Sequence, residues 1–152
     1  MQVATLEHIN ITVSDPKATA DMLMDIFGWH IRWEGPSMDS GYTIHVGTEG
    51  NYIALYAAGT PKRGETASYK MINGLNHIAL IVDDLDAVEK RVLAAGFKTQ
   101  NHGDYEPGRR FYFRDSDFIE YEVVSYPSDK GILKREIIQK MGSMAKYGSL
   151  IR

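Results

Sequence analysis

The chain has 152 residues and a formal net charge of -3 at pH 7, with 43% hydrophobic and 24% charged residues. This length is typical of one domain that buries a core without disulfides, and the composition excludes a disordered chain. There is no basic excess of the kind that nucleic-acid binding requires, so a small-molecule partner is expected. The chain has no cysteine, which excludes a disulfide framework, a thiolate zinc site and a cysteine nucleophile.

The N-terminus has no basic region followed by an apolar run, and no stretch approaches the roughly 20 apolar residues of a membrane span. We therefore expect a soluble, cytoplasmic protein with neither a membrane nor a nucleic acid as its partner.

The first predicted strand lies in LEHINITVSD (6–15), where Ile9, Ile11 and Val13 alternate with His8, Asn10 and Thr12. The segment SDP (14–16) then predicts a helix start, and Gly28 predicts its end. Apolar residues recur between them at helical spacing, at Ala20, Leu23, Met24 and Phe27. Three strand-like runs follow, WHIRWE (29–34), YTIHV (42–46) and YIALYA (52–57).

The same order then returns. LNHIALIVDD (75–84) matches the first phrase at five of ten positions, with His77 in the slot of His8 at an offset of 69 residues. A second helix is predicted from DDLD (83–86) to Gly96. Strand-like runs follow at FKTQ (97–100), RFYFR (110–114) and FIEYEVV (118–124).

The sequence thus predicts an α+β domain over 1–127. It consists of a βαβββ module at 4–58, a linker at 59–73 and a second module at 74–127. In the tail, 128–152, the spacing predicts a C-terminal helix from Leu133, Ile137, Met141 and Met144.

Two tandem βαβββ modules resemble the vicinal oxygen chelate superfamily over about residues 4–127. That superfamily includes glyoxalase I, fosfomycin resistance proteins, extradiol ring-cleaving dioxygenases and methylmalonyl-CoA epimerase. The resemblance implies two four-stranded sheets, each curled into a half barrel, with a metal in the shared cavity. It also implies a homodimer, because members commonly pair and sometimes exchange halves.

Strand alternation puts His8 and His77 on the face of each sheet opposite the apolar residues. On the last strand, Glu120 and Glu122 share a face in the same way. Carboxylates on an otherwise apolar strand are costly to bury without a cation. Two histidines and one carboxylate in one cavity predict a 2-His-1-carboxylate site for one divalent ion, which could be Fe, Mn, Zn or Ni.

The choice of carboxylate rests on the resemblance. The final hairpin of the family reads like D-P-D-G-x-x-I-E, and DSDFIEYE (115–122) matches it with Glu122 as the ligand. Ser116 and Phe118 replace the usual proline and glycine, so a register slip of two residues would bring Glu120 into that place. If Glu122 is the ligand, Glu120 is expected to lie near the substrate.

The equivalent position of the first module is Ala54, where glyoxalase I carries a metal-binding glutamate and the epimerase a glutamine. Its absence argues against the proton-transfer members. The resemblance therefore implies a lyase, dioxygenase or transferase whose metal has three protein ligands. The two branches of this kind are the ring-cleaving dioxygenases and the fosfomycin-type enzymes.

Alternation also places Tyr112 and Arg110 inward on the strand before Glu122, with His45 as the counterpart of Tyr112. We expect Tyr112 and His45 to act in catalysis by donating or accepting a proton. Arg110 could bind a carboxylate or phosphate of the substrate.

Tyr52 and Asn10 are also expected to contact substrate, and both depart from family patterns. Tyr52 stands where ring-cleaving dioxygenases usually carry a histidine, and Asn10 where fosfomycin-type enzymes carry a threonine. Gly131 stands where the latter carry an arginine. Neither reaction is favoured by these residues, and a metal-free sequestering protein of the bleomycin-resistance type is the alternative from another class.

Overall fold

The computed structural model describes residues 3–64 and 68–127, so the predicted C-terminal helix lies outside the described residues. The first module contains β1 (His8–Thr12), α1 (Pro16–Phe27), β2 (His30–Pro36), β3 (Tyr42–Gly47) and β4 (Tyr52–Ala57). The second contains β5 (Ile78–Ile81), α2 (Leu85–Ala94), β6 (Thr99–Tyr105), β7 (Gly108–Arg114) and β8 (Glu120–Ser125). Short 3₁₀ turns lie at Met38–Ser40 and Ser68–Lys70.

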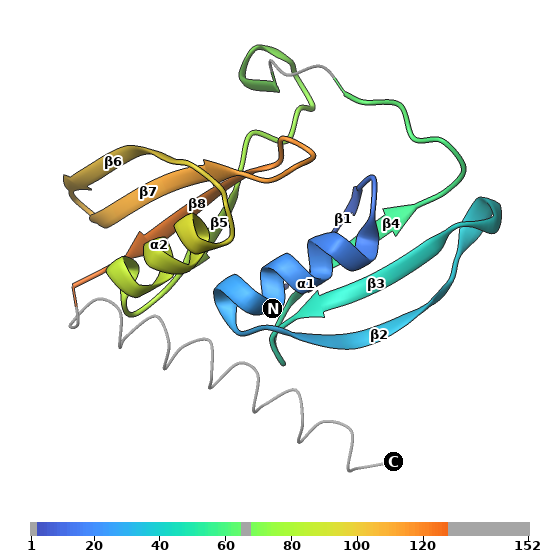
Figure 1. Ribbon diagram of the computed structural model, residues 1–152, viewed down its shortest axis with the longest axis horizontal. Coiled ribbons are helices and arrows are strands. Elements are labelled where there is room, and N and C mark those ends of the chain that lie inside the picture. The colour runs from blue at the N-terminus through green and yellow to red at the C-terminus, as the bar shows by residue number, and fades with distance from the viewer. Residues whose placement is uncertain (1–2, 65–67, 128–152) are drawn as a thin grey trace.

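Each module forms one four-stranded sheet, and the two strand orders are equivalent: β1-β4-β3-β2 and β5-β8-β7-β6. In both sheets the first strand pairs in parallel with the last, and the other pairs are antiparallel. The predicted α+β fold with two βαβββ modules is therefore confirmed. Neither sheet closes into a barrel, and Figure 1 shows both as open, twisted layers.

The helix starts follow the capping residues that the sequence predicts. Asp15 accepts hydrogen bonds from the backbone of Lys17 and Ala18, and Asp84 accepts one from Ala87. Gly28 ends α1 with a φ of 69°, a conformation that favours glycine. The helix α2 ends slightly before its predicted stop at Gly96, because Ala95 already forms its cap.

The two helices contact each other and lie between the two sheets. Leu23 of α1 and Val92 of α2 are fully buried, and the rings of Phe27 and Phe113 lie 6.2 Å apart across the module boundary. One core therefore joins both modules, as the central position of α1 and α2 in Figure 1 illustrates. As a consequence, the other face of each sheet points away from this core.

The strand β6 is longer than the predicted run 97–100, and a bulge between Gln100 and Gly103 interrupts its pairing with β7. Polar and glycine residues in the extension concealed it, since the pairing is set by the neighbouring strand. Across the described residues, neither helix has the length and apolar character that a membrane crossing demands.

Candidate functional site

The outer face of the second sheet carries most of the predicted site residues. Tyr112 pairs with Glu122 and Arg114 with Glu120 across β7 and β8, and directly opposed residues share a face. The parallel pairing of Ala79 with Glu122 brings the side of β5 that bears His77 to the same face. The opposite face, with Phe111, Phe113, Tyr121 and Val123, is buried in the core.

Glu122 is held at both of its oxygens. Its Oε2 lies 3.2 Å from His77 Nε2, and its Oε1 accepts a hydrogen bond from Arg110 Nη1 at 3.1 Å. Only 8% of Glu122 is exposed, so its charge depends on these partners. Of the two carboxylates, Glu122 is thus the one beside the His77 nitrogen.

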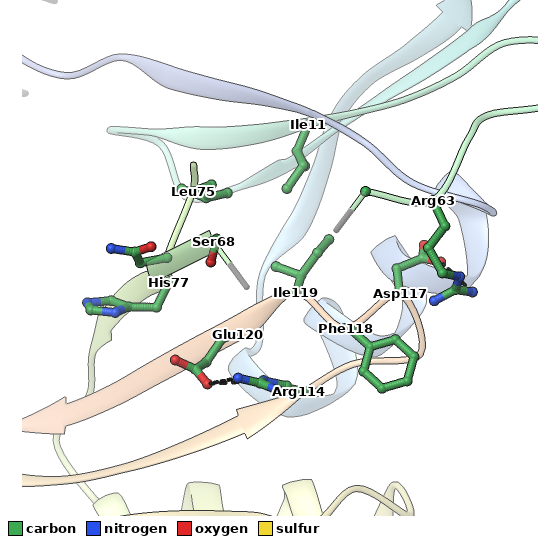
Figure 2. A pocket seen from close by; sticks show the side chains of 12 residues that line it. Ile11, Arg63, Ser68, Leu75, His77, Arg114, Asp117, Phe118, Ile119 and Glu120 are labelled. Carbon is green, nitrogen blue, oxygen red and sulfur yellow. Dashed lines mark hydrogen bonds and ion pairs between the residues drawn. The ribbon is translucent and has the colours of Figure 1, made fainter. Parts of the chain in front are cut away.

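Glu120 is occupied by different partners. It forms an ion pair with Arg114 at 2.9 Å and accepts a hydrogen bond from the Tyr69 hydroxyl at 2.6 Å. This bond to Glu120, together with burial, raises the pKa of Tyr69 to about 12. Figure 2 shows His77, Glu120 and Arg114 around a pocket of about 160 Å³, which Ile11 of β1 also lines.

Sequence reasoning missed Tyr69. It lies in the segment expected to be a linker, at the turn Ser68–Lys70, where no strand alternation predicts the direction of a side chain. Its hydroxyl lies 3.0 Å from His77 Nδ1. The linker therefore contributes directly to the candidate site.

Tyr112 lies beside both candidate ligands of this module. Its ring meets that of His77 edge-on, with 5.8 Å between centroids, and it stands opposite Glu122. Burial and the neighbouring Glu122 carboxylate raise the pKa of Tyr112, so its hydroxyl stays protonated at neutral pH. In this state the hydroxyl is a hydrogen-bond donor.

The turn between β7 and β8 sets the register of the two glutamates. Asp115 is buried and accepts hydrogen bonds from the backbone of Asp117 and Ile119 and from the Tyr121 hydroxyl. Burial raises the pKa of Asp115 against these three bonds. Phe118, in place of the usual glycine, adopts a φ of 64°.

Replacing Phe118 with glycine should stabilise the protein, because this left-handed conformation costs a non-glycine residue about 1 kcal/mol. We expect Phe118→Gly to raise the free energy of unfolding by about 1 kcal/mol in urea denaturation. Phe118→Ala removes the same exposed ring but keeps the Cβ, so it should give no such gain. Equal stability of the two variants would contradict the argument from strain.

The outer face of the first sheet carries the other predicted residues. His8 pairs with Tyr52, and Asn10 with Ala54, which in turn pairs with His45. The pair His45–Ala54 therefore corresponds to Tyr112–Glu122, and an alanine stands where the second module has its glutamate. The first module thus offers one candidate ligand, His8.

Stacked rings cover this face. Tyr52 stacks on His8 at 4.9 Å and on His45 at 4.5 Å, and Trp33 lies 5.0 Å from His45. The guanidinium of Arg32 lies 4.6 Å from the centre of the Tyr52 ring. The sequence did not indicate Trp33 or Arg32, because a bulge between Ile31 and Trp33 shifts the alternation of β2.

Burial and an unfavourable electrostatic interaction with His8 lower the pKa of His45 below its ordinary value of about 6.5. The unfolded chain then binds a proton more tightly than the folded protein does. Stability from neutral His45 is complete above pH about 6.5 and decreases as the pH falls toward the folded-state pKa. Urea unfolding between pH 7.5 and 5 should therefore show a smaller stability loss in His45→Gln than in the wild type, and equal losses would contradict this shift.

Within one chain, the three predicted ligands do not meet. His77 and Glu122 belong to the second module, whereas His8 lies on the first sheet. In residues 3–64 and 68–127, no three histidine, aspartate or glutamate side chains are placed to hold a metal ion. The arrangement expected for a single shared cavity is thus split into two half-sites.

Hydrogen bonds cross the module boundary. Arg91 Nε donates to the carbonyl of Ile26 at 2.7 Å, and the backbone N–H of Ser14 donates to Asp117 at 2.7 Å. Together with the shared core, these bonds fix the two helices between the sheets.

Comparison with solved structures gives the same fold. A glyoxylase/bleomycin resistance protein/dioxygenase domain from Frankia sp. EAN1pec superposes with a TM-score of 0.70 at 22% identity, covering 83% of this chain and all of that one. The fosfomycin resistance protein FosX from Listeria monocytogenes, crystallised with Mn(II) and sulfate, superposes with a TM-score of 0.64 at 21% identity. The superposition covers 86% of this chain and 99% of the FosX chain. No curated protein matches this sequence.

The model of the Glyoxalase/Bleomycin resistance protein/Dioxygenase superfamily matches residues 5–123. This range includes both modules, and both half-sites lie within it. A fosfomycin resistance protein crystallised with Mn(II) thus shares the fold. The chain therefore belongs to the Glyoxalase/Bleomycin resistance protein/Dioxygenase superfamily.

Proposed function

We propose that the protein is a divalent-metal-dependent enzyme that acts on a small molecule with vicinal oxygens. His77 and Glu122 would hold the ion together with His8 of the partner subunit. The observation that carries this proposal is the 3.2 Å separation of His77 Nε2 and Glu122 Oε2 on one sheet face.

This distance suits two ligands of one ion. Nitrogen and oxygen ligands lie at about 2.1 Å from a zinc-like ion, so two of them at a right angle stand about 3 Å apart. Arg110 binds the other oxygen of Glu122, which leaves Oε2 for the ion. Imidazole and carboxylate are suitable donors for Mn, Fe, Zn or Ni.

The third ligand must come from a second copy if the module packing persists. The first sheet offers His8 but has Ala54 in the place of the ligand glutamate, and the second offers His77 and Glu122. These two faces are complementary, so two copies that place unlike faces together would form two complete sites. We therefore expect a homodimer with a two-fold axis.

When bound, the ion would supply Lewis-acid stabilisation of substrate oxygens. Around it, Tyr112 would donate a hydrogen bond to a substrate oxygen, and His45 of the partner subunit would accept a proton. Arg110 has a further donor to offer: in the described part of the chain, its Nε is the buried side-chain polar atom without a hydrogen-bond partner. The stacked rings of the first sheet would cover the substrate from the other side.

Two reactions fit these residues. The Arg110 and Arg114 guanidinium groups on the ligand face support an anionic substrate, as in a fosfomycin-type enzyme. A FosX structure described with Mn(II) and 1S,2S-dihydroxypropylphosphonic acid is among the structures of this fold. The aromatic row of Trp33, His45 and Tyr52 instead supports a planar ring, as in a ring-cleaving dioxygenase.

Loading with Mn(II) or Fe(II), followed by assays, tests the proposal. The Mn(II) protein should open fosfomycin with water or a thiol, or the Fe(II) protein should consume dioxygen with a catechol. Either activity should disappear in His77→Ala. A protein that retains no divalent ion under anaerobic loading but binds aromatic ligands would instead be a sequestering protein.

A further inference from the structure

The turn Ser68–Lys70 places a tyrosine over the ligand face of the second sheet. This segment is closed by two backbone hydrogen bonds, from Met71 to Ser68 and from Gly74 to Met71. A side chain at Gly74 would meet the backbone of Ser68 at 2.8 Å, so only glycine permits this tight approach. The chain then enters β5 just after His77.

The Tyr69 hydroxyl connects two side chains of the face. It donates its single proton to Glu120 Oε1 at 2.6 Å and lies 3.0 Å from His77 Nδ1. Since the proton is used for Glu120, the phenol oxygen can only accept from His77, which places the imidazole proton on Nδ1. In the neutral ring, the lone pair is then on His77 Nε2, which lies 3.2 Å from Glu122 Oε2.

Glu120 is itself fixed. Arg114 donates to Glu120 Oε2 from Nε at 3.1 Å and from Nη2 at 2.9 Å. Only 7% of Glu120 is exposed, so this carboxylate has little freedom to choose another partner. A chain of hydrogen bonds therefore runs from Arg114 through Glu120 and Tyr69 to His77.

In the first module, Nδ1 of the candidate ligand histidine also has a partner, here without an intervening tyrosine. His8 Nδ1 is paired directly with the neighbouring carboxylate of Glu7. In both modules an acceptor engages Nδ1 of the candidate ligand histidine and leaves Nε2 for another partner. Metal-binding histidines typically have such an acceptor on the nitrogen that does not bind the ion.

We propose that Tyr69, fixed by Glu120 and Arg114, is a positioning residue that holds His77 in the Nδ1-protonated form with Nε2 directed toward Glu122. This inference rests on the proposed function, because it assigns the Nε2 lone pair to the metal ion. It gives Glu120 a role distinct from that of Glu122. The two carboxylates then have different roles: Glu122 binds the ion, and Glu120 orients the ligand His77 through Tyr69.

Tyr69→Phe tests the proposal, because it removes only the hydroxyl of a residue that is 58% exposed. Two measurements are needed: Mn(II) affinity by calorimetry, and the His77 tautomer in metal-free protein by ¹H–¹⁵N correlation NMR. We expect the Mn(II) dissociation constant to rise about 10- to 100-fold. We also expect a shift of the His77 proton from Nδ1 toward Nε2.

Tyr42→Phe is the matched control. Tyr42 is also influenced by a carboxylate, since Glu34 contributes with burial to raising its pKa, but it lies on the first sheet. It should change neither measurement. An unchanged tautomer and an unchanged Mn(II) affinity in Tyr69→Phe would overturn the role of Tyr69. A wild-type protein that binds no Mn(II) would instead refute the proposed function, and the tautomer would still decide whether Tyr69 orients His77.

Discussion

Glu122→Ala is expected to reduce bound metal from about one ion per chain to almost none after anaerobic loading. The substitution removes the oxygen that lies 3.2 Å from His77 Nε2. It also leaves the Arg110 charge, which is only 13% exposed, without its partner. We therefore expect a loss of stability of about 3 kcal/mol in addition, from the uncompensated charge. Elemental analysis and urea unfolding measure the two effects separately.

Glu89→Ala provides the matched control for Glu122→Ala. Glu89 lies 2.6 Å from His102 Nε2 and accepts a hydrogen bond from Thr99, so it too belongs to a histidine–carboxylate pair of this module. That pair joins α2 to β6, away from the ligand face. Glu89→Ala should retain the metal content of the wild type. Full metal retention in Glu122→Ala would exclude Glu122 as a ligand.

Mixing two inactive variants is expected to restore metal binding. His8→Ala and Glu122→Ala should each lack complete sites. A mixed dimer, however, combines His8 of one chain with His77 and Glu122 of the other at one of its two sites. After unfolding and refolding together in equal amounts, the mixture should bind about a quarter of the wild-type metal, because half of randomly formed dimers are mixed.

A mixture of the single variants His77→Ala and Glu122→Ala is the control for this experiment. Both substitutions damage the same half-site, so no pairing of these two chains gives a complete site, and metal binding should not return. If His8→Ala alone retained a full complement of metal, His8 would not be a ligand. If only the mixture of His8→Ala with Glu122→Ala recovers metal binding, the metal site must contain residues from two chains.

The fold followed from local patterns in the sequence. Alternating residues in 8–13 and 77–82, acidic caps at Asp15 and Asp84, and the repeat itself predicted the order of elements in both modules. These signals are local, since each depends on strand or helix periodicity and on capping. The extension of β6 to Tyr105 was missed, because its pairing with β7 rather than its own composition holds it in the sheet.

Alternation also predicted which side of β7 and β8 carries Tyr112 and Glu122, and the strand pairing places them opposite each other. It could not indicate Tyr69, whose position depends on how an irregular segment folds back over β5. Nor could it indicate Trp33, which a β-bulge turns toward His45. Both residues depend on departures from regular structure.

The sequence by itself determined the two modules, the order of their elements along the chain and the face on which each candidate ligand lies. It did so because residue periodicity dictates which side of a strand is apolar and hence buried. Only the tertiary structure decided that His8 is separated from His77 and Glu122 in one chain. An apolar helix face can be buried against several partners, and here α1 and α2 bury theirs against each other. That packing leaves the ligand-bearing face of each sheet outside the shared core.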